Sequence, residues 1–140
     1  MQKTFAMIKP DAVKRNCVGG IIDMIEKAGF EIVKMKKVHY PRAFFESFYQ
    51  VHSARPFFND LVEQMSASPI VVMILEKENA INDWRNLMGA TDPSKAEQGT
   101  IRAKFGLNVG ENSVHGSDSE ATARIECAMV FPSASSCSLK

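Results

Sequence analysis

The sequence contains short runs that are rich in apolar and β-branched residues. Such runs predict β-strands, and three of them cover residues 3–8, 30–40 and 70–75. The third run is uninterrupted and follows Pro69, which is typical of a central strand buried on both faces. Near the carboxyl end, the alternation over residues 125–131 predicts a fourth strand, with Glu126 on the face opposite Ile125.

Between these runs, apolar residues recur with the spacing of helices. We expect helices at residues 20–28, 43–51, 57–65 and 80–88, and a helical turn at 100–105. Gly29 and Gly89 are suited to end the first and fourth helices. Residues 90–99 predict a polar loop, and residues 117–119 resemble the start of a helix. This order predicts an α+β fold: a ferredoxin-like split βαβ arrangement with a four-stranded antiparallel sheet and added helices.

Composition agrees with one globular domain over residues 1–140, whose tail, residues 132–140, we expect to be poorly ordered or in a subunit contact. The chain is 45% hydrophobic and 24% charged, as is usual for such domains. A net charge of +1 gives no bias toward polyanions, so we expect no specific nucleic-acid partner. The cluster Lys34, Lys36 and Lys37 is typical of a solvated strand edge.

The three cysteines, Cys17, Cys127 and Cys137, are odd in number and lack metal-ligand spacing. This favours a reducing compartment over a disulfide framework. The sequence has no apolar run long enough to span a membrane and no apolar core of a signal peptide. We therefore expect a cytoplasmic protein that does not associate with membranes.

One of the three histidines lies in a chemically suggestive setting. His39 and His52 have no recognisable neighbourhood, and we expect them to be structural or exposed. His115 precedes Gly116, which allows close approach of a ligand, and it stands just before the expected helix start, where anions are favoured. On these local grounds alone, a structural turn remains the better interpretation.

Three cations could contact phosphates, although each could equally be a surface charge: Lys9, Arg85 and Arg102. The chain has no Walker A or Gly-x-Gly-x-x-Gly pattern, so side chains would have to replace a glycine-rich loop.

Several blocks of sequence together decide between these alternatives. Residues 112–119, Asn-Ser-Val-His-Gly-Ser-Asp-Ser, resemble the signature of nucleoside diphosphate kinases. Further blocks resemble that family in the same order and with compatible spacing: residues 8–13, Tyr49 with residues 55–58, residues 85–91 and residues 99–102. The resemblance covers residues 2–131. Ser68 and Trp84 depart from the family's usual residues, outside the motif positions.

The resemblance implies a reversible ping-pong reaction, in which a nucleoside triphosphate phosphorylates His115 and a nucleoside diphosphate then takes up the phosphoryl group. Glu126 would orient the imidazole, Ser117 would support Glu126, and Tyr49 would help to position the site.

By the same resemblance, Lys9, Arg85, Thr91 and Arg102 would contact the phosphates. Asn112, together with Lys9, would bind the sugar hydroxyls. Phe57 and Val109 would hold the base by apolar contact, with broad base specificity; on sequence grounds alone these two residues could equally be core. Mg²⁺ would be held mainly by nucleotide phosphates and water, without protein ligands. The family also implies a homo-oligomer, either a tetramer or a hexamer built from dimers.

Two other functions remain to be weighed. An RNA-recognition domain would need exposed aromatic residues on two central strands, but Phe5 is the one aromatic residue in the two expected strands at 3–8 and 70–75. A catalytically silent family member is the second alternative, and the presence of the full set of motif residues argues against it.

Overall fold

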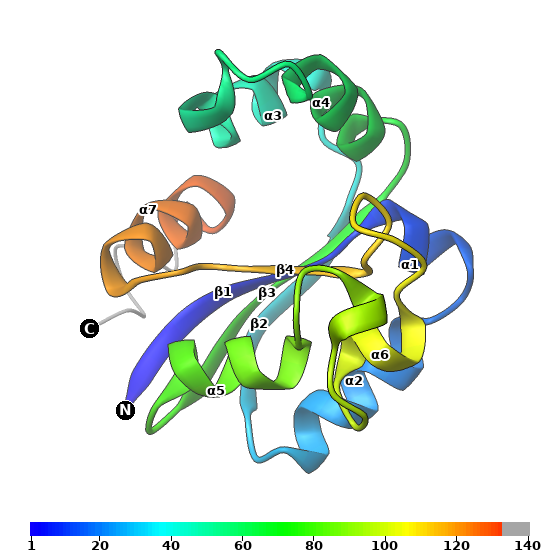
Figure 1. Ribbon diagram of the computed structural model, residues 1–140. Coiled ribbons are helices and arrows are strands. Elements are labelled where there is room, and N and C mark those ends of the chain that lie inside the picture. The colour runs from blue at the N-terminus through cyan, green and yellow to red at the C-terminus, as the bar shows by residue number, and fades with distance from the viewer. Residues whose placement is uncertain (133–140) are drawn as a thin grey trace.

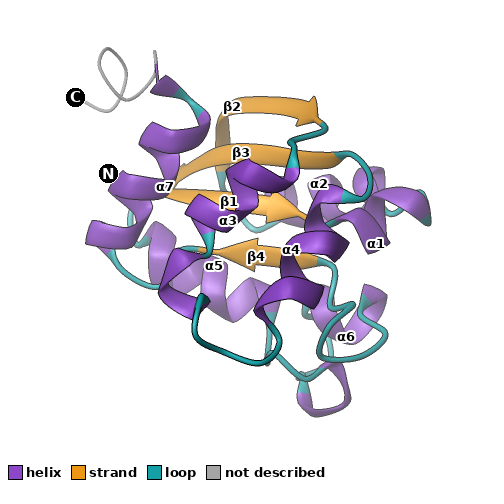
Figure 2. Ribbon diagram, turned by 90° about the horizontal axis from the view of Figure 1, so that it is seen from above, coloured by secondary structure: helices purple, strands orange, loops and turns teal. Residues whose placement is uncertain are grey.

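The computed structural model describes residues 1–132, so all but Pro132 of the expected tail, and also Cys137, lie outside the described residues. The sheet consists of β1 (Gln2–Ile8), β2 (Glu31–Val38), β3 (Ile70–Lys77) and β4 (Val114–Gly116). Its order is β2-β3-β1-β4, and all neighbouring strands are antiparallel (Figure 2). The predicted ferredoxin-like sheet is confirmed.

Helices cover both faces of the sheet (Figure 1). The described helices are α1 (Pro10–Lys14), α2 (Val18–Lys27), α3 (Arg42–Phe48), α4 (Phe58–Ser66), α5 (Ala80–Met88), α6 (Ile101–Phe105) and α7 (Glu120–Val130). Two short 3₁₀ turns, η1 (Gln50–His52) and η2 (Pro93–Lys95), lie in the connections. In Figure 1, α3, α4 and α7 lie on one side of the sheet, and α2, α5 and α6 on the other. None of these helices is long and apolar enough to cross a membrane.

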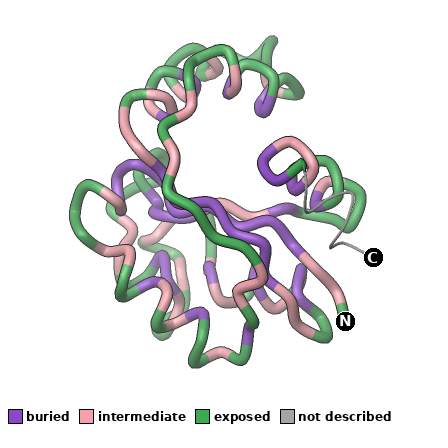
Figure 3. The backbone as a smooth tube through the Cα atoms, turned by 180° about the vertical axis from the view of Figure 1, so that it is seen from behind, coloured by how far each residue is buried: buried purple, intermediate pink, exposed green. Residues whose placement is uncertain are grey.

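The two-residue period of β1 divides the core into two layers. Phe5 and Met7 pack with the core that includes α3, α4 and α7 residues, whereas Ala6 and Ile8 pack with the core that includes α2 and α5 residues. β3 is buried from Ile70 to Leu75, as its apolar run predicts. Figure 3 shows the buried strands between helices whose outer sides are exposed.

The lysine-rich strand β2 forms one edge of the sheet, and Lys34, Lys36 and Lys37 are exposed, as predicted. The strand ends at Val38, so the expected strand over residues 30–40 is slightly too long and His39 lies just beyond it. His39 is exposed, and its Nε2 lies 2.8 Å from the Ser66 carbonyl.

The prediction of a strand over residues 125–131 is wrong, because residues 125–130 belong to α7 and Phe131 follows its end. The Ser119 hydroxyl accepts a hydrogen bond from the Thr122 N–H, which starts the helix where residues 117–119 suggested a cap. The buried positions are Ala123, Glu126, Cys127 and Val130, which is the spacing of one helical face. Ile125 is 61% exposed. The fourth strand is instead β4, which carries His115 in a segment where the local sequence favoured a turn.

Candidate active site

His115 lies in the middle of β4, where the backbone is held by β1. His115 pairs with Met7, and its neighbours Val114 and Gly116 pair with Ile8 and Ala6. Three aromatic rings surround the imidazole: Phe48, Tyr49 and Phe5, whose centroids lie 5.6, 6.0 and 6.2 Å from its own. The strand and the three neighbouring aromatic rings therefore hold the imidazole in place. The His115 side chain is 25% exposed.

Glu126 approaches one nitrogen of the imidazole from α7. Its Oε1 lies 3.5 Å from His115 Nε2, and the same oxygen accepts a 2.7 Å hydrogen bond from the Ser117 hydroxyl. Nε2 is buried and makes no hydrogen bond within the described residues, so Glu126 faces it at ion-pair distance. The structure thus brings His115, Ser117 and Glu126 together, although Glu126 arrives on a helix and not on the predicted strand.

Tyr49 packs edge-on against the imidazole at the end of α3, with ring planes 87° apart. Burial raises the pKa of the Tyr49 phenol, and the charge of Glu126 raises it further. Tyr49 therefore stays a neutral hydroxyl at physiological pH.

A second group of predicted residues is connected by hydrogen bonds at the end of β1. Lys9 Nζ donates to the Asn112 side-chain oxygen and to the Gly110 carbonyl, each at 3.0 Å. Asn112 Nδ2 donates to the Thr91 carbonyl at 3.1 Å. Desolvation lowers the pKa of the buried Lys9 ammonium, while the nearby Asp11 carboxylate acts in the opposite direction. Lys9, Asn112 and the Thr91 backbone thus form one connected cluster.

The two predicted arginines differ in their environment. Arg102 is buried and donates to the Gly89 and Val114 carbonyls, at 2.9 Å each, so it contacts the residue that precedes His115. Its Nε is buried without a described partner. Arg85, in the last turn of α5, is exposed, as is Thr91. Arg85 lines a hollow of about 420 Å³ with Lys95 and Thr100, and the described contacts do not join it to the histidine.

Phe57 and Val109, the predicted base contacts, are 47% and 56% exposed, so they are not core residues. Phe57 precedes α4 and lies against the His52 ring, with centroids 5.6 Å apart. Val109 lies in the loop before β4. Gln64 on α4 donates to the Gly110 carbonyl at 3.1 Å, which ties this loop to the helix that Phe57 precedes.

The comparisons with known proteins agree with this arrangement. The family model described as "Nucleoside diphosphate kinase" matches residues 2–136. The chain belongs to the nucleoside diphosphate kinase family. It is 59% identical over 131 residues to the nucleoside diphosphate kinase of Geobacter sulfurreducens, covering 94% of this chain and 96% of the relative. It is 60% identical over 133 residues to that of Trichlorobacter lovleyi, covering 95% and 96%.

Solved structures of nucleoside diphosphate kinases have the same fold. The enzyme from Encephalitozoon cuniculi superposes with a TM-score of 0.92 at 36% identity, covering 96% of this chain and 91% of that one. The Aquifex aeolicus enzyme gives a TM-score of 0.90 at 38% identity, covering 93% and 94%.

A cavity of about 520 Å³ opens beside His115 in this family member. It lies between α3 with η1 on one side and α7 on the other, and its lining includes Tyr49, His115 and Glu126. Its outer part is apolar, with Val51, Ile125 and Met129. This apolar part was not predictable from the alternation over residues 125–131, which places Ile125 on a strand and not on the exposed side of α7.

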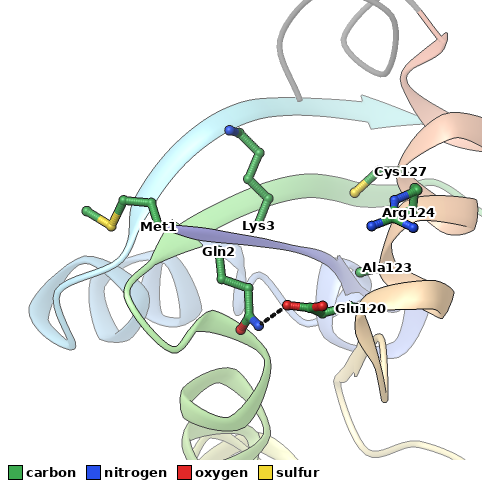
Figure 4. Close-up of a pocket in the computed structure, with 7 residues that line it drawn as sticks. All are labelled: Met1, Gln2, Lys3, Glu120, Ala123, Arg124 and Cys127. Atoms are coloured by element: carbon green, nitrogen blue, oxygen red, sulfur yellow. Dashed lines mark hydrogen bonds between the residues drawn. The ribbon is translucent and has the colours of Figure 1, made fainter. Parts of the chain in front are cut away.

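A separate cavity of about 250 Å³ lies beside the first residues of β1 and one side of α7 (Figure 4). Lys3, Arg124 and Cys127 line it, and Gln2 donates to Glu120 at its rim. None of the predicted site residues lines this cavity.

Three further residues shape the site without having been predicted to do so. Trp84, one of the departures from the family pattern, is fully buried and packs against Gly116, where an added Cβ would overlap its indole. Asp11 and Ser113 connect α1 to the residues before β4. Asp11 and Ser113 both lie in sequence blocks that resemble the family, but nothing in those blocks indicates which residues touch.

Proposed function

We propose that this chain transfers the γ-phosphoryl group of a nucleoside triphosphate to a nucleoside diphosphate through a phosphohistidine on His115, by a reversible ping-pong reaction. The observation that carries the proposal is the position of Glu126 and Ser117 on one side of the imidazole. Because Nε2 faces the carboxylate, Nδ1 is the nitrogen left for the phosphorus atom.

The chemistry follows from this division of the two nitrogens. A neutral imidazole with its proton on Nε2 has a lone pair on Nδ1 and is nucleophilic near pH 7. Nδ1 bonds to the γ-phosphorus as the bond from that phosphorus to the β–γ bridging oxygen breaks, and the diphosphate leaves. The ring becomes an imidazolium, which the Glu126 carboxylate stabilises. A second diphosphate then attacks the phosphorus and restores the neutral ring.

Phosphoryl transfer depends mostly on positioning and charge stabilisation. We assign the phosphate contacts to Lys9, Arg85, Thr91 and Arg102, and the sugar contacts to Asn112 with Lys9. An ammonium has three N–H groups, and Lys9 uses two of them on Gly110 and Asn112, which leaves one for the nucleotide. Phe57 and Val109 would hold the base, and Tyr49 would keep the imidazole in place.

We further propose that the nucleotide enters as its Mg²⁺ complex. Mg²⁺ keeps several waters and is usually bound through substrate phosphates in sites of this kind. Among residues 1–132, no three His, Cys, Asp or Glu side chains come together as a metal site. The Mg²⁺ neutralises charge on the phosphate oxygens when bound.

We also propose that the protein is a single-domain, cytoplasmic homo-oligomer, either a tetramer or a hexamer of dimers. The thiols of Cys17 and Cys127 are free, which agrees with a reducing compartment.

Labelling tests the catalytic proposal directly. Incubation with γ-labelled ATP and Mg²⁺ should place label on His115, stable in alkali and lost in acid, and any nucleoside diphosphate should remove it. His115→Ala should abolish labelling, whereas the exposed His39→Ala should leave it unchanged. Peptide mapping that found the label on a serine, or full turnover by His115→Ala, would refute the mechanism.

A further inference from the structure

The loop that leads into β4 contains a residue with an unusual backbone. Ser113 has φ = +78°, in the left-handed region that non-glycine residues rarely adopt. It is fully buried, and its hydroxyl has no described partner. Such a conformation persists only where the surrounding structure holds it, and it is concentrated at functional sites. Ser113 stands between Asn112 and the strand of His115, so its backbone determines how the two are aligned.

Two contacts from the start of α1 hold this backbone. The Ser113 N–H donates to Asp11 Oδ2 at 3.1 Å, and the Ser113 carbonyl accepts from the Lys9 N–H at 2.8 Å. The Asp11 side chain is only 4% exposed, and its nearest cationic side chain at 4.0 Å is Arg15. A buried carboxylate is costly without partners. Burial raises the pKa of Asp11, the charge of Lys9 opposes this most, and the Ser113 N–H contributes as well. Oδ2 accepts that N–H, whereas Oδ1 is buried without a described partner.

The same carboxylate acts on Lys9. The charged groups that face Lys9 are Asp11 on α1, Arg102 on α6 and Glu111 in the loop before β4. Burial lowers the pKa of Lys9, and Asp11 is the strongest of the groups that raise it. Asp11 therefore favours the charged form of a side chain that also binds Asn112.

We propose that Asp11 is a positioning residue of the phosphoryl-transfer site, whose carboxylate holds Ser113 in its left-handed conformation and so aligns the Lys9–Asn112 pair with His115. Asp11 makes no contact with the nucleotide in this arrangement. It acts through Ser113 and Lys9, and the inference rests on the function proposed above.

The first test uses a rescue. Asp11→Ala removes the acceptor of the Ser113 N–H, and we expect kcat/KM for a nucleoside diphosphate to fall by about 10- to 100-fold, the effect of a small misplacement of catalytic groups. Glycine adopts positive φ without strain. Adding Ser113→Gly to Asp11→Ala should therefore recover most of the loss. The matched control is Asp23→Ala, an exposed carboxylate on α2 that pairs with Lys27, which should behave like the wild type.

The second test separates charge from hydrogen bonding. Asp11→Asn keeps an oxygen that can accept the Ser113 N–H but removes the negative charge. Lys9 binds phosphate and sugar as a cation, so its contribution is present below its pKa and lost as the pH rises through it. Without the anion, the pKa of Lys9 falls, and the high-pH limb of the kcat/KM profile should move to lower pH.

The outcomes distinguish this inference from the proposed function. A merely structural Asp11 would lower the melting temperature of Asp11→Ala while leaving KM and the pH limb of Asp11→Asn unchanged, and that result overturns the inference. Failure of Ser113→Gly to rescue also overturns it. If Asp11→Ala does not fold, the inference is tested by the high-pH limb of the kcat/KM profile of Asp11→Asn. Absence of label on His115 in the wild type refutes the proposed function itself.

Discussion

At the scale of single residues, Phe57 and Val109, which we propose hold the nucleotide base, have apolar side chains. Apolar contacts discriminate weakly between similar groups, and stacking is open to every base. We expect adenine, guanine, cytosine and uracil diphosphates all to accept the phosphoryl group, with kcat/KM values within about two orders of magnitude. The measurement is the rate of loss of label from phosphorylated enzyme. A preference above about 10³-fold would mean that a polar group reads the base edge.

The sequence predicts which residues belong to the site better than it predicts how they touch. His115, Glu126 and Ser117 meet as the family resemblance implies. The packing of Trp84 on Gly116 was not predictable, because it depends on how closely α5 approaches β4. The positive φ of Ser113 was not predictable either, because it is a property of the folded loop and not of serine.

At the scale of elements, β4 packs closely against α5 at Gly116. A Cβ at Gly116 would overlap the Trp84 indole and lie 2.8 Å from Met88 Cε. Gly116→Ala should therefore push β4 away from α5, cost about 1–3 kcal/mol of unfolding free energy and reduce phosphorylation of His115. Gly19→Ala is the matched control, because nothing lies within 4 Å of the added Cβ on α2.

Gly19→Ala should leave activity unchanged and stabilise the fold by about 0.5–1 kcal/mol, since alanine is the better helix former. Chemical denaturation and labelling, measured on both variants, check the pair. Wild-type stability and labelling in Gly116→Ala would contradict the close packing.

The carboxyl end of α7 is capped from another element. Lys36 on β2 donates to the Val130 carbonyl at 2.8 Å, and its ammonium lies 4.8 Å from the Phe131 ring centroid. A cation at the carboxyl end of a helix stabilises it. Lys36→Ala should cost about 0.5–1 kcal/mol, measured by urea denaturation, while Lys37→Ala on the same exposed strand should cost less. Equal effects would show that Lys36 acts only as a surface charge.

The elements with a strong period were predictable, and α7 shows where the pattern misleads. Alternating apolar residues over 125–131 satisfy a strand, but the face that becomes buried is Ala123, Glu126, Cys127 and Val130. That face contains a carboxylate, which lowers its apolar signal. Glu126 is buried because it contacts Ser117 and His115. A charged residue therefore occupies the buried face of α7, and the helical period cannot be recognised from apolar residues alone.

At the scale of the whole molecule, the candidate site forms where a strand near the start of the chain pairs with a strand near its end. β1 and β4 are neighbours in the sheet although more than a hundred residues separate their partners Met7 and His115. This pairing brings Lys9, at the end of β1, beside the residues before β4, while α7 returns Glu126 to the histidine. The candidate site is therefore assembled by β1, which sequence periodicity predicts, together with β4 and α7, which it does not.

The assembly state is a further prediction at this scale. Both faces of the sheet are covered by helices of the same chain, so unpaired apolar sheet faces do not argue for association. What remains is the family resemblance and the exposed edge strand β2, where Met35 is 50% exposed between lysines. We expect light scattering to give four or six times the 15.5 kDa mass of one chain, because exposed strand edges are sites of pairing and identical chains form closed symmetric assemblies. Samples diluted to micromolar concentration should keep that mass, and a monomer there would refute the prediction.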